Sequence, residues 1–289
     1  MLSVQTNVSA ISAQRNLGRT SNALGTAMER LSSGFRINRA ADDAAGLAVS
    51  EKLKAQIGGL NQASRNAQDG ISMIQTAEGA LDAVQTMMQR MRDLSVQASS
   101  DTNSSTERDN INLELTQLTQ EINSVSVRTK FNGQSLLDGT MGTGTNAGIA
   151  TLQTGANKLD ETQVKFVNTS VDTNTSIVAM KDLSVALSAY STTASRANAS
   201  DLIDKLDKAL GSISSSRATL GAAQNRLQYT IANLGTTSEN LSASNSRIRD
   251  VDVATESSNM AKNQVLEQAG VSVLAQANQL PQLALKLLG

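Results

Sequence analysis

The sequence predicts a mainly α-helical protein, an elongated antiparallel bundle of long, coiled-coil-like helices with a small β-hairpin region and paired terminal helices. Three observations carry this prediction. Apolar residues recur at alternating steps of three and four over long stretches. Aromatic residues make up 2% of the 289 residues and Trp is absent, which suits narrow helix seams better than a globular core. Pro281 is the single proline, so the commonest helix breaker is almost missing.

The first half predicts three helices. Two short apolar stripes lie within the first 31 residues: Val4, Val8 and Ile11, then Leu17, Leu24, Met28 and Leu31. The spacing resumes near residue 45 and holds one phase to about residue 99, roughly 80 Å of helix at 1.5 Å per residue. After a break at 99–105, the steps from Ile111 to Val125 predict a shorter helix.

The middle of the chain has a different composition. Residues 131–170 are rich in Gly, Thr and Asn and contain two alternating runs, IATLQTG and TQVKFVN. We expect a β-hairpin region here, with turns at Asn132-Gly133 and around 155–160. The heptad spacing returns from Ile203 to Ile248 and again from Leu266 to Leu287. A long helix running out and another running back would place the two termini together.

Composition removes several classes of function. There is no Cys and no His, so disulfides, thiolate metal sites and Ser-His-Asp chemistry are excluded. The net charge is −1, which gives no electrostatic footprint for nucleic acid. We see no membrane-spanning apolar run and no Sec-type leader, and we expect no cleaved signal peptide. The sequence therefore predicts no enzyme, no catalytic residue, no cofactor and no metal.

Two charged segments interrupt the helical pattern: LSSGFRINRAADDAAG at 31–46 and SRIRDVDVATE at 246–256. Acidic oxygens can bind Ca²⁺, but calcium-loop spacing is missing and guanidiniums match the carboxylates. We therefore expect ion pairs and helix caps, with the two segments side by side. The residues concerned are Arg36, Arg39, Asp42, Asp43, Arg247, Arg249, Asp250 and Asp252.

The two terminal segments carry apolar stripes and few charges. Isolated helices are marginal in water, and two paired helices bury little surface. This predicts weak order in the monomer and self-assembly through both ends. The expected polymerisation seams are Val4, Val8, Ile11, Leu24, Met28, Leu31, Leu266, Val273, Ala277, Leu280 and Leu287.

Five stretches together resemble bacterial flagellin: LSSGFRINRAADDAAGLAVSEKL, QRMRDLSVQAS at 89–99, TKFNGQSLLDG at 129–139, LGAAQNRLQYTIANL at 220–234, and the tail 246–289. The chain ends LLG where the family often ends LLR. Only 168–182 stands where larger flagellins insert outer domains, so a short form is expected. The resemblance implies inner-tube helices at 1–33 and 256–289, connecting spokes at 34–46 and 246–255, and a rod domain at 47–245.

The same resemblance implies a structural subunit of the extracellular flagellar filament, which serves swimming motility. Such a subunit is exported unfolded by the flagellar type III route. Implied partners are further copies of the chain, cap and hook-junction proteins, and an export chaperone, with no nucleic acid or membrane. Toll-like receptor 5 would bind the monomer at Arg90, Leu94, Gln97 and Glu114. A hook–filament junction protein and a non-polymerising coiled-coil adaptor are the alternatives.

Overall fold

The computed structural model describes residues 7–141, 148–171 and 178–288, without the side chains of 178–179 and 280–288. The chain divides into two compact units. The terminal unit comprises Met1–Ile57 with Glu239–Gly289, and the central unit comprises Gly58–Ser238. The long helices α2 (Ala44–Ala98) and α5 (Arg196–Arg249) each contribute residues to both units.

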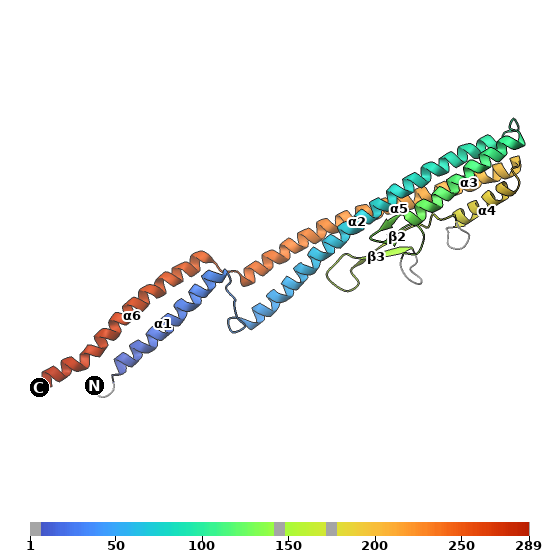
Figure 1. Ribbon diagram of the computed structural model, residues 1–289. Helices are drawn as coiled ribbons and strands as arrows, with labels where there is room; N and C mark the ends of the chain where they lie inside the picture. Colours follow the sequence, from blue (N-terminus) through green and yellow to red (C-terminus); the bar gives the residue numbers. More distant parts are fainter. Residues whose placement is uncertain (1–6, 142–147, 172–177, 289) are drawn as a thin grey trace. The chain divides into compact units, whose positions relative to one another are not determined.

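The terminal unit is built on α1 (Val8–Ser33) and α6 (Val253–Leu288), which lie side by side (Figure 1). They are antiparallel, because Asn7 Nδ2 donates to the carbonyl of Ala277 over 2.7 Å while Arg30 lies beside Glu256. The Asn7 side chain also accepts from Ala10 N and begins α1. Gly34 ends the helix with φ +75°, a left-handed conformation that glycine adopts without a Cβ clash.

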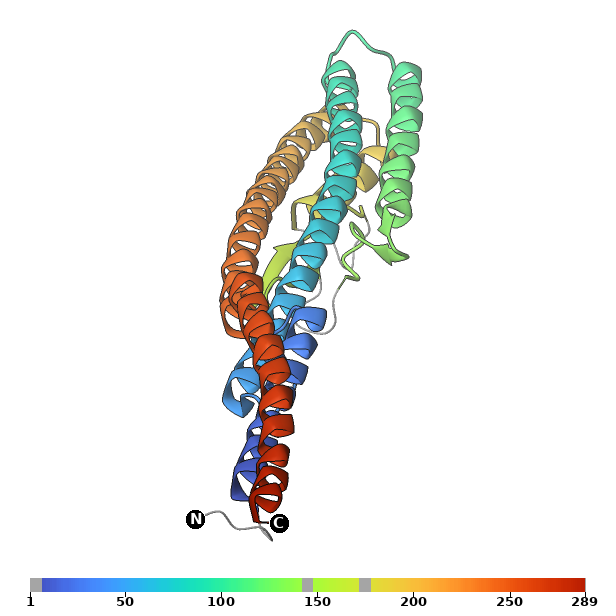
Figure 2. The ribbon, with the colours of Figure 1, turned by 90° about the vertical axis from the view of Figure 1, so that its left-hand side faces the viewer.

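The central unit packs α2, α3 (Ser105–Arg128), α4 (Val178–Thr192) and α5 around one hydrophobic core. Figure 2 shows α2 and α3 as an antiparallel pair joined by a short loop. A capping box stops that loop and starts α3: Glu107 N donates to Ser104 Oγ, and Ser104 N donates to the Glu107 carboxylate.

Two hairpins complete the central unit. The first pairs β1 (Lys130–Phe131) with β2 (Gln134–Ser135) through a two-residue turn, in which Asn132 and Gly133 have φ 49° and 81°. Asn-Gly is the preferred sequence for such a turn, because both residues need positive φ. The second pairs β3 (Ile149–Gln153) antiparallel with β4 (Glu161–Lys165). Alternate residues of β4 are buried, so the hairpin closes one side of the core.

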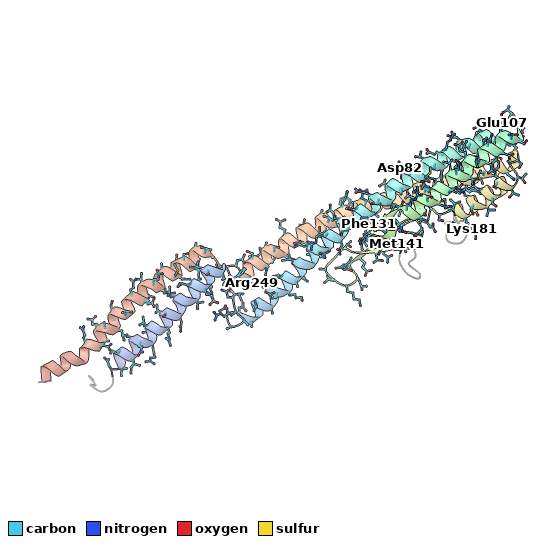
Figure 3. All side chains as sticks on the ribbon, viewed as in Figure 1. Asp82, Glu107, Phe131, Met141, Lys181 and Arg249 are labelled. Carbon is cyan, nitrogen blue, oxygen red and sulfur yellow. The ribbon has the colours of Figure 1, made fainter. Side chains whose placement is uncertain are left out.

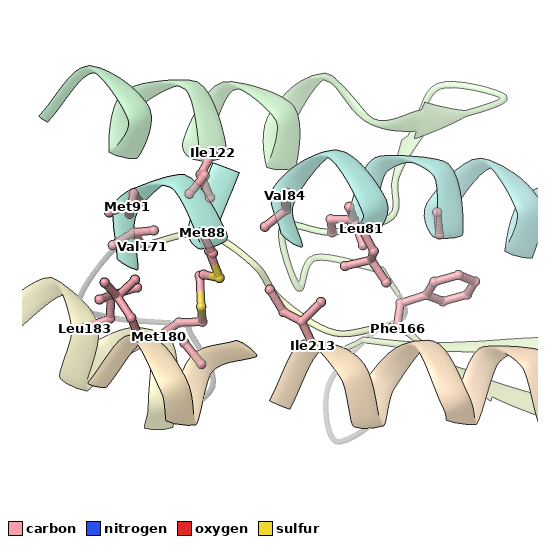
Figure 4. Close-up of a cluster of buried hydrophobic side chains, with 14 of the residues drawn as sticks. Leu81, Val84, Met88, Met91, Ile122, Phe166, Val171, Met180, Leu183 and Ile213 are labelled. Atoms are coloured by element: carbon pink, nitrogen blue, oxygen red, sulfur yellow. The ribbon is translucent and has the colours of Figure 1, made fainter. Parts of the chain in front are cut away.

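The core of the central unit is dense and aliphatic. In Figure 4 the side chains of Met88 and Met180 meet between α2 and α4, and Leu81 faces Ile213 and Phe166. Methionine fills irregular gaps of this kind because its unbranched thioether is flexible. The fully buried residues of this core include Ile74, Leu81, Met88, Met91, Leu115, Ile122, Leu137, Met180, Leu183, Tyr190, Leu202, Leu206 and Ile213.

The predicted fold class is confirmed: the long helices, the shorter α3, the hairpin region and the paired terminal helices are all present. One element was missed. No helix was predicted within the short segment 168–182, whereas α4 begins at Val178 and contributes Met180, Leu183 and Tyr190 to the core. With 15 residues, α4 is too short to show a sustained heptad.

Candidate assembly surface

The contact between α1 and α6 follows a heptad on both helices. The less exposed residues recur at steps of three and four, which is the spacing of a coiled-coil seam. On α1 they are Ala10, Ala13, Leu17, Thr20, Leu24, Ala27 and Leu31, and on α6 they are Glu256, Met260, Asn263, Glu267, Gly270, Leu274 and Ala277.

This inner contact is thin. Among the described apolar side chains of the two helices, the buried ones are Ala27 at 2% exposure and Ala277 at 6%. A Cβ added to Gly270 would lie 3.3 Å from Leu17 Cδ1, so the glycine lets the helices approach closely. Small residues give close approach but bury little apolar area, and apolar area is the main source of stabilisation.

Larger apolar side chains of the same pair remain in solvent. Of the predicted seam, Val8, Ile11 and Met28 on α1 and Leu266 and Val273 on α6 are exposed by 46–65%. Leu24 and Leu31 are partly buried and Ala277 is buried, all in the inner contact. Val4, Leu280 and Leu287 lie outside the described side chains.

Three more valines of the α1–α6 pair are exposed and were not predicted: Val253, Val265 and Val271. They lie outside the heptad positions from which the α6 seam was predicted. Apolar residues on several sides of one surface helix were the available signal. We define the outer apolar surface as Val8, Ile11, Met28, Val253, Val265, Leu266, Val271 and Val273.

The two charged segments lie side by side in the terminal unit. Arg36 N donates to the carbonyl of Arg249 over 2.6 Å, and Val251 N donates to the carbonyl of Gly34 over 3.0 Å. These bonds surround an antiparallel bridge between Phe35 and Asp250. The returning break is short: α5 ends at Arg249 and α6 begins at Val253, because Asp252 caps the new helix at once.

The expected ion pairs within this set did not form among the described residues. Arg39 pairs with Glu29 at 3.0 Å and Arg249 pairs with Glu51 at 2.7 Å, so glutamates on the flanking helices replace the aspartates. Arg249 lies at the end of α5 (Figure 3). Its guanidinium also stacks on the Phe35 ring, 4.7 Å from the ring centroid. Arg36 donates to the carbonyl of Ile248, and Arg247 donates to Ser244 Oγ. The pairing glutamates gave no sequence signal, because they lie inside regular helix.

The aspartates instead hold backbone amides. Asp42 accepts from the N–H groups of Arg39 and Asn38, and these bonds lower the pKa of its carboxyl. Asp43 accepts from Gly46 N over 2.8 Å. The Asp252 carboxyl accepts from the Thr255 hydroxyl and from Ala254 N, which lowers its pKa too. Short acidic side chains fit this capping geometry, whereas longer glutamates reach across to arginines.

The predicted receptor-binding residues are divided between surface and core. Arg90 Nε donates to Glu114 Oε1 over 2.8 Å, and both side chains are exposed on α2 and α3. Gln97 is also exposed. Leu94, however, is 2% exposed and belongs to the core. Its place on this surface is corrected: it supports the helix from beneath instead of facing solvent.

Metal and membrane features can be stated for the described part of the chain. No group of three or more His, Cys, Asp or Glu side chains there could hold a metal ion. None of its helices contains a stretch long and apolar enough to cross a membrane.

Comparison with known proteins gives two family-model matches. Residues 4–142 match the bacterial flagellin N-terminal helical region, and residues 203–288 match the bacterial flagellin C-terminal helical region. The chain is 48% identical over 282 residues to a flagellin of Halalkalibacterium halodurans and 45% identical over 305 residues to a flagellin of Bacillus subtilis. Both alignments cover 98% of each chain.

A solved structure of a putative flagellar hook-associated protein from Vibrio parahaemolyticus has a TM-score of 0.58. It covers 72% of this chain and 100% of its own length at 13% identity, so it shows a shared fold alone. Fold and sequence therefore define a helical structural protein of the bacterial flagellum. The chain belongs to the bacterial flagellin family, as a short form, and is a structural subunit of the flagellar filament.

Proposed function

We propose that the chain polymerises through the outer apolar surface of its α1–α6 pair, to build a filament for swimming motility. The observation that carries the proposal is the contrast within this pair: the described apolar side chains that are buried are those of Ala27 and Ala277, while Val8, Val265 and Val273 are 65%, 65% and 56% exposed. A group of large apolar side chains left in solvent on one helix pair marks an interaction site.

The occupant of this surface is another copy of the chain. Covering apolar area contributes about 25 cal/mol per Å², so copies that cover each other's valines and leucines gain what the inner contact lacks. Because the exposed apolar residues lie on several sides of the helix pair, one side of a copy can contact a different side of the next copy. Such a contact repeats from copy to copy and produces a helical polymer. The capped turns at Gly34 and Asp252 fix where α1 ends and where α6 begins. They therefore help to determine which side chains each helix exposes to other copies.

The test compares two valines of similar exposure. Val273 on α6 is 56% exposed and Val185 on α4 is 59% exposed. We expect Val273→Asp monomers to fail to elongate filament seeds, because a carboxylate would have to be buried without a partner. Val185→Asp monomers should elongate them.

Electron microscopy and sedimentation of the seeded reactions measure the result, and circular dichroism checks that both variants keep their helices. Normal elongation by Val273→Asp would overturn the proposed surface. So would filaments formed by a chain that lacks residues 1–30 and 256–289.

We further propose export in an unfolded state by the flagellar type III route, with an export chaperone, and assembly beneath a cap protein on a hook-junction base. The chain supports threading because it has no cysteine and one proline, so unfolding needs no disulfide reduction. Secretion should stop in cells that lack the export apparatus; secretion that continued there would contradict this route.

We also propose that free monomers bind Toll-like receptor 5 through the exposed Arg90, Gln97 and Glu114. Arg90 and Gln97 are two turns apart on α2, and the ion pair to Glu114 positions the guanidinium. Arg90→Ala and Gln97→Ala monomers should signal less in a receptor reporter assay, with the exposed Lys181→Ala on α4 as the control. Unchanged potency of both variants would remove this surface from the proposal.

A further inference from the structure

Among the methionines that the structure describes, one is far more exposed than the others. Met28 is 55% exposed on α1. Met87 and Met260 are half-buried. The other described methionines are buried at 7% exposure or less: Met73, Met88, Met91, Met141 and Met180. An oxidant in solution therefore meets the Met28 sulfur before the core sulfurs, because oxidation of thioethers follows exposure.

A more polar side chain at position 28 would affect the proposed contacts between copies of the chain. It would leave the contacts within a single copy unchanged. Its neighbour Ala27 is 2% exposed and belongs to the inner contact with α6, while Met28 itself is 55% exposed. Met28 belongs to the outer apolar surface. No hydrogen bond or ion pair within the described chain involves its side chain.

We propose that Met28 is a peroxide-sensitive modification site whose oxidation blocks addition of the monomer to a filament; this rests on the proposed function. The sulfur gives two electrons to hydrogen peroxide, the O–O bond breaks, and an S–O bond forms. The products are methionine sulfoxide and water. A methionine sulfoxide reductase restores the thioether: two thiols supply two electrons and two protons and become a disulfide, the S–O bond breaks, and the oxygen leaves as water.

The sulfoxide would act through desolvation. Its oxygen is a strong hydrogen-bond acceptor, and covering an acceptor without a donor costs free energy. In the monomer the group stays in water, so the fold is unaffected. At a contact between copies it would lose that water, and the critical concentration for elongation should rise about tenfold.

Assembly should in turn protect the residue. A sulfur covered by a neighbouring copy is no longer accessible to peroxide. We therefore expect peroxide to convert Met28 rapidly in monomers and slowly in filaments. The half-buried Met260 lies in the inner contact of one chain and should react at similar rates in both forms.

The experiment treats monomers with hydrogen peroxide, maps the sulfoxides by peptide mass spectrometry, and measures elongation of seeds. Elongation is expressed as the ratio of treated to untreated monomer for each chain. The ratio should fall about tenfold for the wild type, return after treatment with the reductase and dithiothreitol, and stay near one for Met28→Leu. Met260→Leu should keep the wild-type sensitivity.

Three results would overturn the inference. The first is slower oxidation of Met28 than of Met260, the second is an undiminished ratio in the wild type, and the third is full sensitivity in Met28→Leu. Failure of the proposed function looks different, because untreated wild-type monomers would then not elongate seeds at all.

Discussion

The central unit and the α1–α6 pair use the same heptad spacing and reach different degrees of burial. In the central unit Leu81, Leu115 and Leu206 are fully buried. Among the described side chains of the terminal pair, the buried apolar ones are those of Ala27 and Ala277. The heptad spacing therefore determines which helix faces pack together. The size of the packed side chains determines whether that contact by itself is enough to stabilise the helices.

The placement of large side chains differs in the same way. In the described part of the central unit, helices α2, α3, α4 and α5 and two hairpins surround the large aliphatic residues, which therefore find partners on several sides. The terminal pair has two helices, and the valines of its outer apolar surface are exposed. A two-helix contact cannot enclose residues on more than one face, so further burial requires another chain.

The largest effect should follow from cutting the core of the central unit. Leu81→Ala removes a fully buried side chain and should lower the free energy of unfolding by about 2–5 kcal/mol. The same truncation at Leu266, which is 47% exposed, should change it by less than about 0.5 kcal/mol. Urea denaturation followed by circular dichroism measures both. Similar losses of unfolding free energy for Leu81→Ala and Leu266→Ala would contradict the difference in burial between the two regions.

A smaller effect should follow from Arg249→Ala in the terminal unit. The variant loses the ion pair to Glu51 and the stacking on Phe35. These interactions contribute about 1 kcal/mol together. Arg247→Ala is the matched control two residues away, because its side chain is exposed and bonds to Ser244. Thermal unfolding of both variants measures the difference, and Arg249→Ala should melt at the lower temperature. Equal melting temperatures would show that the Arg249 side chain does not stabilise the fold.

The sequence predicted much of the fold because heptads and hairpin signals are local patterns. It predicted α2 over 45–99 and the structure has Ala44–Ala98. Ion-pair partners are not local: Arg249 meets Glu51 from a distant part of the chain, and Arg39 meets Glu29 only because the chain reverses after Gly34. The burial of Leu94 likewise depends on which face of α2 the other helices cover.

The smallest expected effect concerns the acidic caps of the terminal unit and appears only at low pH. Backbone amides of Arg39 and Asn38 lower the Asp42 pKa below its ordinary 3.8. A lowered folded-state pKa adds stability at all pH values above the unfolded value, and this stability is lost as the pH falls through the folded value. Asp42→Asn keeps an oxygen acceptor but cannot titrate. Thermal melts below pH 3.8 should therefore fall more steeply for the wild type than for Asp42→Asn. Leu81→Ala, which keeps the carboxylate, should show the wild-type slope. Parallel slopes for wild type and Asp42→Asn would mean that this turn is held by its neighbours and does not depend on the charge of Asp42.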